Sequence, residues 1–83
     1  MNIYTLETVT NDYYEYCDLK MTSVSIHVII DEIKRLENAK CSCDYYAVGV
    51  YDGFTGKLLR EATVSKKDVP TITKESIQFE VIK

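Results

Sequence analysis

Cysteine and histidine are the residue types in this sequence best able to bind a metal, and Cys41 and Cys43 are their only closely spaced pair. Structural zinc sites usually leave two or more residues between paired cysteines and draw on a second pair elsewhere in the chain. Here Ser42 alone separates the pair, and only Cys17 and His27 could complete a four-ligand set. The sequence therefore predicts no metal site, and the three cysteines are expected to be free thiols.

The sequence patterns expected of a catalytic site are also poorly matched. A cysteine or serine nucleophile needs a base and an orienting group beside it. No Gly-x-Ser-x-Gly turn is present, and no segment around a cysteine has the pattern of a catalytic nucleophile. The glycines between Gly53 and Lys57 are too close together for a phosphate loop, and Leu58 stands where that loop needs a hydroxyl. We therefore expect neither enzymatic activity nor a cofactor.

Acidic and tyrosine side chains dominate the start of the chain, which has no lysine or arginine before Lys20. Tyrosine is enriched at interface hot spots, and carboxylates attract a basic partner. The alternative is that tyrosines, as good strand formers, cover the edges of a sheet. The residues that this pattern predicts to contact a partner, with an aromatic residue at a predicted turn, are Glu7, Tyr14, Tyr16, Asp18 and Phe54.

The charge balance opposes binding to nucleic acid or to anionic lipid. The formal net charge is −3 at pH 7. Residues 1–40 carry seven acids and four bases, whereas residues 41–83 carry six of each. Because recognition of a phosphate backbone requires a basic surface, direct nucleic-acid binding is disfavoured. The acidic first half predicts a basic protein as the partner.

A β-hairpin is predicted to carry these acidic residues. Ile3 to Thr10 and Tyr13 to Met21 alternate as strands do, and Asn11-Asp12 suits a two-residue turn. This register places Glu7 opposite Tyr16. The predicted core face holds Tyr4, Leu6, Cys17, Leu19 and Met21, and the predicted exposed face holds Glu7, Tyr14, Tyr16 and Asp18.

A helix is predicted from Ser23 to Asn38, with Thr22 or Ser23 as its cap. Apolar residues recur at helical spacing and form one stripe: Ile26, Ile29, Ile30, Ile33 and Leu36. Val24, Ile26 and Val28 also alternate with polar residues. A strand that runs into a shorter helix is therefore the alternative.

A second hairpin and a last strand are predicted after the helix. Tyr45 to Tyr51 and Lys57 to Val64 are strands joined by a turn at Asp52 to Gly56, and Ser65 to Glu75 suits a loop or crossover. A final strand alternates at Ile77, Phe79 and Val81. The order ββαβββ predicts a single small α+β domain over residues 1–83, with one helix packed on a mainly antiparallel sheet of about five strands.

The length of the chain and of its apolar runs bears on membrane contact, export and dimer formation. The 83 residues contain no apolar run near the roughly 20 residues that span a bilayer, and the first residues lack the features of a signal peptide. A cytoplasmic protein without membrane contact is expected. Because a core of this size leaves a thin margin of stability, a homodimer is also considered.

These observations favour a non-enzymatic protein-binding module that occludes a basic, nucleic-acid-handling surface of its partner. In size and charge the chain resembles small phage and mobile-element inhibitors of host nucleases, including anti-CRISPR proteins, although no sequence motif carries that resemblance. Two alternatives are a homo-oligomeric structural or accessory protein and a weak nucleic-acid binder that stacks bases on its tyrosines.

Overall fold

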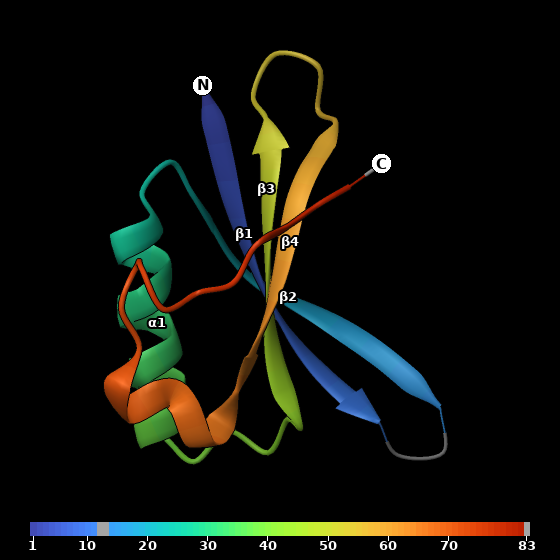
Figure 1. Ribbon diagram of the computed structural model, residues 1–83. Helices are drawn as coiled ribbons and strands as arrows, with labels where there is room; N and C mark the ends of the chain where they lie inside the picture. The colour runs from blue at the N-terminus through green and yellow to red at the C-terminus, as the bar shows by residue number, and fades with distance from the viewer. Residues whose placement is uncertain (12–13, 83) are drawn as a thin grey trace.

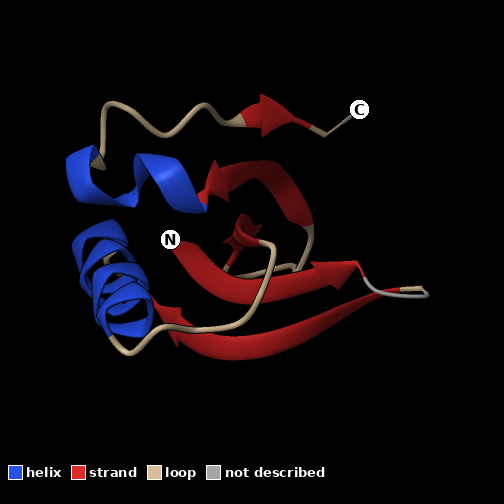
Figure 2. Cartoon of the chain, turned by 90° about the horizontal axis from the view of Figure 1, so that it is seen from below, coloured by secondary structure: helices blue, strands red, loops and turns tan. Residues whose placement is uncertain are grey.

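The computed structural model describes residues 1–11 and 14–82, which form a twisted sheet with both helices on one side (Figures 1 and 2). The elements are β1 (Asn2–Asn11), β2 (Glu15–Ser23), α1 (Ile26–Asn38), β3 (Tyr45–Asp52), β4 (Leu58–Ser65), the 3₁₀ helix η1 (Lys66–Thr71) and β5 (Glu80–Val81). Neighbouring strands are antiparallel, in the order β2-β1-β3-β4-β5. The predicted α+β fold, a helix packed on an antiparallel five-stranded sheet, is confirmed.

The core lies between α1 and the strand residues that face it. Ile29 and Ile33, in the predicted stripe, are fully buried. They belong to one cluster with Leu6, Tyr46 and Val48, which are fully buried as well. Burying an aliphatic side chain contributes roughly 1.5–3 kcal/mol, so this contact decides which face of the sheet turns inward.

The helix begins later than predicted, because β2 continues through Ser23 and α1 starts at Ile26. Ser23 pairs with Tyr4 in the ladder, so sheet hydrogen bonds replace a first helical turn. Ser25 holds the N-cap position without a side-chain cap bond, and its N–H donates instead to the Ser23 hydroxyl at 3.0 Å. The alternative of a strand leading into a shorter helix is thus correct.

The helix ends in a Schellman motif. The Cys41 N–H donates to the Leu36 carbonyl at 3.0 Å, and the Lys40 N–H donates to the Glu37 carbonyl at 3.0 Å. Lys40 has a φ of 58°, in the left-handed region. That conformation costs an L-residue about 1–2 kcal/mol, and glycine usually occupies the position. The motif turns the chain into the connector that carries Cys41 and Cys43.

The predicted register of the first hairpin is wrong. Tyr16 lies opposite Thr10, not opposite Glu7. The predicted turn residue Asp12 and the predicted strand start at Tyr13 lie outside the described residues. Tyr16 is therefore displaced by three positions along β1, and an odd displacement exchanges the two faces of a strand.

This displacement changes which residues of β2 face the helix. Cys17 and Leu19, predicted to lie in the core, face away from α1, whereas Tyr16 and Asp18 lie on the helix-bearing side. Lys20 is an extra residue in β2 and forms a β-bulge. Because of this bulge, the residues after Lys20 face the sides of the sheet that the sequence predicted. Beyond the bulge, Met21 pairs with Leu6 and packs against the core as predicted.

The second hairpin agrees with its prediction. β3 and β4 pair from Tyr45 opposite Ser65 to Tyr51 opposite Leu58. In the turn, the Asp52 carboxylate accepts the N–H of Phe54 at 2.8 Å. Gly56 has a φ of 72°, which explains the glycine at this position.

The C-terminal segment forms less sheet than predicted. Among the described residues of this segment, only Glu80 and Val81 form ladder pairs with β4, although the expected strand begins at Ile77. Ile77 is buried and Phe79 packs against the core, so their alternation reflects burial of an extended segment without a full ladder. The predicted loop after Ser65 contains η1, which the sequence did not indicate.

Lys40→Gly is expected to raise the free energy of unfolding by about 0.5–1 kcal/mol, because glycine relieves the steric cost of the left-handed conformation while adding entropy to the unfolded chain. Urea denaturation followed by circular dichroism measures the change. The matched variant Lys34→Gly, in the exposed interior of α1, should lose about 1 kcal/mol. A loss of stability in Lys40→Gly would contradict the cost assigned to this position.

Candidate functional site

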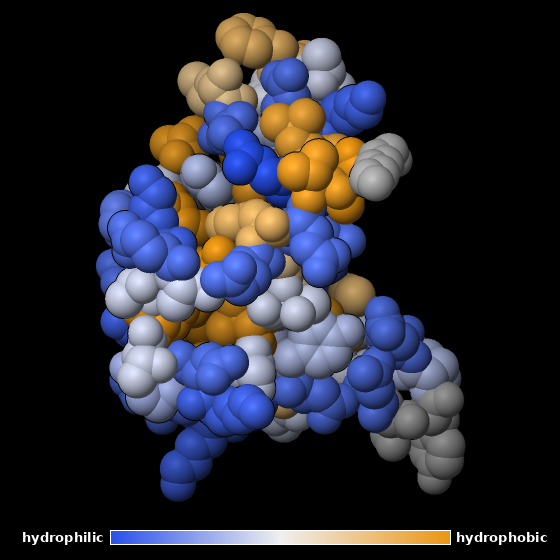
Figure 3. Space-filling model, viewed as in Figure 1, coloured by the Kyte–Doolittle hydropathy of each residue, from blue (hydrophilic) through white to orange (hydrophobic). Residues whose placement is uncertain are grey.

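The sheet face opposite α1 carries a groove of about 430 Å³. β3 forms its floor, the β1–β2 hairpin forms one wall, and β4 with the C-terminal segment forms the other. Figure 3 shows the molecule notched on the right, between the hairpin arm below and the C-terminal segment above. The twist of the sheet therefore turns its uncovered face into a concave surface.

Both walls of the groove are acidic. Glu7 and Glu15 line the hairpin wall, and Glu61 and Glu80 line the opposite wall. Glu61 and Glu80 are direct cross-strand partners in the β4–β5 ladder. The groove is lined entirely by described residues, and none of them is a lysine, arginine or histidine. Like charges in a cross-strand pair destabilise a sheet, so a positive charge close to Glu61 and Glu80 would stabilise this pair.

The floor between the walls is apolar and uncharged. Val9 is 2% exposed, and Ala47 lies beside it on β3. Tyr45, directly opposite Val9, adds a phenol. Among the residues that the structure describes, no three His, Cys, Asp or Glu side chains could hold one metal ion. The carboxylates thus flank an elongated surface and do not converge on a point.

The negative field acts on a thiol and a phenol within the groove. Desolvation raises the pKa of Cys17, and the carboxylates of Glu7 and Glu15 raise it further. Desolvation, Glu15 and Cys17 also raise the pKa of Tyr45, against the effect of a hydrogen bond with Asn11. Both groups are therefore neutral hydrogen-bond donors near pH 7.

The predicted partner-binding residues do not share one face. Glu7 lies in the groove, whereas Tyr16 and Asp18 lie on the other side of the hairpin. The rings of Tyr14 and Tyr16 are 6.1 Å apart and tilted by 54°. They are 74% and 51% exposed, so the two tyrosines form a small aromatic patch at the end of the hairpin.

The other predicted site residues lie apart from this patch. Asp18 forms an ion pair with Lys20 at 2.7 Å. Phe54 is 87% exposed, in the turn between β3 and β4. Sequence reasoning missed Glu61 and Glu80, because only the strand order brings them to the same groove as Glu7.

Comparison of this chain with protein-family models, curated proteins and solved structures finds no match. Function must therefore be inferred from the residues of the chain itself. Neither α1 nor any other described helix has the length and apolar character needed to cross a membrane.

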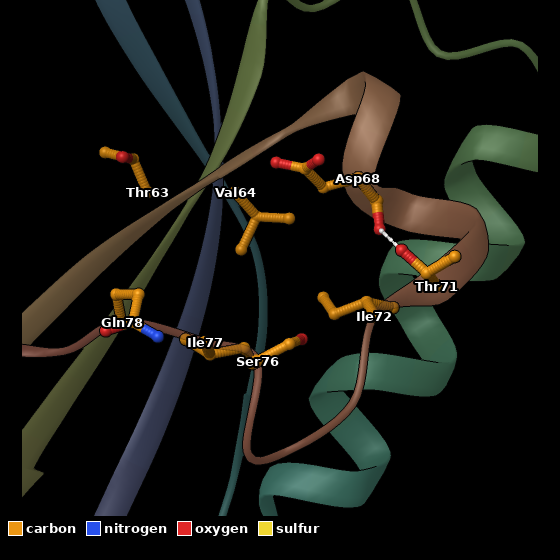
Figure 4. Close-up of a pocket in the computed structure, with 8 residues that line it drawn as sticks. All are labelled: Thr63, Val64, Asp68, Thr71, Ile72, Ser76, Ile77 and Gln78. Carbon is orange, nitrogen blue, oxygen red and sulfur yellow. Dashed lines mark hydrogen bonds between the residues drawn. The ribbon is translucent and has the colours of Figure 1, made fainter.

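A second cavity, of about 330 Å³, lies between β4, η1 and the C-terminal segment (Figure 4). Val64, Ile72 and Ile77 supply its apolar side, and Asp68 is its only charged side chain. The hydroxyl of Thr71 donates to the Asp68 carbonyl at 3.3 Å. None of its eight lining residues, all described, is a histidine, lysine or cysteine.

The sole histidine is not brought to a cysteine. His27 is in the first turn of α1, and Cys41 and Cys43 follow the last turn. Cys17 lies on the opposite face of the sheet from the helix. The expectation that the protein has no enzymatic activity stays a prediction, and the acidic groove is the candidate site that the geometry favours.

Replacing a groove carboxylate should make Cys17 more reactive. In Glu7→Gln, loss of the negative charge is expected to lower the pKa of Cys17 and to increase its alkylation by iodoacetamide severalfold, because the thiolate is the reactive form. Peptide mass spectrometry measures the rate at Cys17. Asp31→Asn, which removes a distant exposed carboxylate, is the control, and an equal rate in the two variants would argue against a local field.

Proposed function

We propose that this domain is a non-enzymatic protein-binding module whose acidic groove receives a lysine- or arginine-bearing segment of a partner protein. The observation that carries the proposal is the pairing of two acidic walls with an apolar floor on the uncovered face of the sheet. Glu61 and Glu80 are cross-strand partners, so two negative charges on one wall attract the same cation.

The groove suits basic side chains in shape as well as charge. Lysine and arginine have apolar stems that can lie along Tyr45 and Ala47, while their charged ends reach the wall carboxylates. The thiol of Cys17 and the phenol of Tyr45 can donate hydrogen bonds to backbone carbonyls of the bound segment.

The finer proposal concerns the partner. Basic protein surfaces commonly hold nucleic acid through its phosphates, and an acidic surface competes for the same lysines and arginines. Occlusion of a nucleic-acid-handling protein, in the manner of a phage or mobile-element inhibitor, is therefore the mechanism we propose. A steep fall of affinity with salt accompanies such binding.

The two alternatives have weaker support. Self-association would use the open edge of β2, but the bulge at Lys20 interrupts that edge. Bulges and lysines are devices by which proteins block edge-to-edge pairing. The groove carboxylates oppose binding of a nucleic acid, because they repel its phosphates.

The proposal is tested with a fluorescein-labelled peptide of alternating lysine and serine, whose binding is followed by fluorescence anisotropy at low and high salt. The double variant Glu61→Gln/Glu80→Gln should bind about tenfold more weakly than the wild type, roughly 0.7 kcal/mol for each carboxylate. It should also fold without loss of stability, because a like-charge pair is removed.

The control is Asp31→Asn/Glu75→Gln, which removes two exposed negative charges outside the groove. Its affinity should match the wild type. Equal weakening of both double variants would mean that net charge alone drives the binding, and absence of peptide binding by the wild type at low salt would overturn the proposal. A pull-down from nuclease-treated lysate with the wild type and both variants then tests whether a nucleic-acid-handling protein is the partner.

A further inference from the structure

The connector between α1 and β3 carries two thiols, Cys41 and Cys43, with only Ser42 between them. Cys41 is half-buried, and Cys43 is only 5% exposed and belongs to the core cluster. Cys43 lowers the pKa of the Cys41 thiol, and Cys41 raises the pKa of Cys43, so the two thiols act on one another. One thiol is therefore partly accessible from solvent, and the other is buried in the core.

Two lysines from distant parts of the chain surround this pair. The ammonium group of Lys66 donates to the Cys41 carbonyl and lies 3.6 Å from a carboxylate oxygen of Glu37. The Tyr46 hydroxyl donates to that same oxygen at 2.8 Å, so Glu37 is held in place. Lys20, in the bulge of β2, adds a second positive charge close to both thiols.

We propose that Cys41 and Cys43 form a thiol–disulfide exchange site for low-molecular-weight disulfides such as oxidised glutathione. The Cys41 thiolate attacks one sulfur of the disulfide, a mixed disulfide forms, and one glutathione leaves as the thiolate. The Cys43 thiol then loses its proton to solvent, and its sulfur attacks the Cys41 sulfur. A second glutathione thiolate leaves, so two protein thiols are oxidised to one Cys41–Cys43 disulfide while the glutathione disulfide is reduced to two thiols.

The charges around the pair assign these roles. Burial raises the pKa of Cys41, but the hydrogen bonds from Cys43 and the charges of Lys66 and Lys20 outweigh it, so the pKa is lowered. Burial, together with the hydrogen bond and charge of Cys41, raises the pKa of Cys43. Cys41 is thus the attacking thiolate. Its reaction removes the negative charge that suppresses ionisation of Cys43, so the resolving thiol becomes active only after the first step.

Cys17 provides an internal comparison. It is more exposed than Cys41, yet the groove carboxylates raise its pKa. If exposure alone governed reactivity, Cys17 would react first. The electrostatic argument predicts the opposite order, with Cys41 reacting before Cys17. This site lies away from the acidic groove, so the inference does not depend on the proposed binding function.

The test uses the reduced full-length chain with oxidised glutathione near neutral pH, quenched by alkylation at successive times and read by peptide mass spectrometry. In the wild type, the peptide that contains Cys41 and Cys43 should become lighter by two hydrogens, the mass change of a disulfide, while Cys17 remains a free thiol. Cys43→Ser should accumulate one glutathione at Cys41, and Cys43→Ala serves the same purpose if the serine variant does not fold. Early glutathionylation of Cys17, or no mixed disulfide at Cys41 in a folded Cys43 variant, would overturn the proposal.

A second pair of variants tests the role of the lysine. Lys66→Gln should slow the reaction of Cys41 severalfold and move its pH profile upward, because the thiolate loses a stabilising charge. Lys67→Gln makes the same change at the next, exposed residue and should leave the rate and profile unchanged. Equal effects of the two variants, or none from Lys66→Gln in a folded protein, would show that Lys66 does not activate the thiol.

Discussion

The contact between the isoleucine stripe of α1 and the inward residues of β1 and β3 determines the rest of this structure. Side chains alternate along a strand, so burying Leu6 and Val48 under Ile29 sends their sequence neighbours to the other face. Only one face receives helices, and the opposite face remains free (Figure 2). The groove exists because of this division into one covered face and one free face.

The free face is acidic for a reason that only topology reveals. Glu7 and Glu61 lie far apart in the sequence, on strands that both neighbour β3, and β5 adds Glu80 directly opposite Glu61. A sheet selected for stability alone would avoid such a like-charge pair. Two like charges paired on one face therefore support the proposal that this surface recognises a positive charge.

The α1 stripe and the second hairpin could be predicted from sequence because each depends on local spacing. Isoleucines at helical intervals indicate a buried stripe whatever they pack against. Gly53 and Gly56 mark a turn between two alternating segments. The local pattern was ambiguous where β2 meets α1, because Val24, Ile26 and Val28 fit both periods, and pairing with β1 decided the outcome.

The first hairpin shows where local reasoning ends. Alternation identified both strands, but register depends on which residues pair, and a displacement of three positions moved Tyr16 from the side of Glu7 to the side of Thr10. The predicted acidic surface was therefore divided between two faces. Glu7 retained its candidate role only because Glu61 and Glu80 approach it from the other end of the chain.

The three thiols show the same limit for chemistry. In the sequence they are equivalent cysteines without a recognisable motif, and net charge says only that the chain is acidic. In the fold, desolvation and the carboxylates of Glu7 and Glu15 raise the pKa of Cys17, whereas Cys43 and the charges of Lys66 and Lys20 lower the pKa of Cys41. Charge therefore acts through its arrangement: the same sheet that gathers glutamates into a groove on one face leaves Lys20 and Lys66 to act on a different thiol.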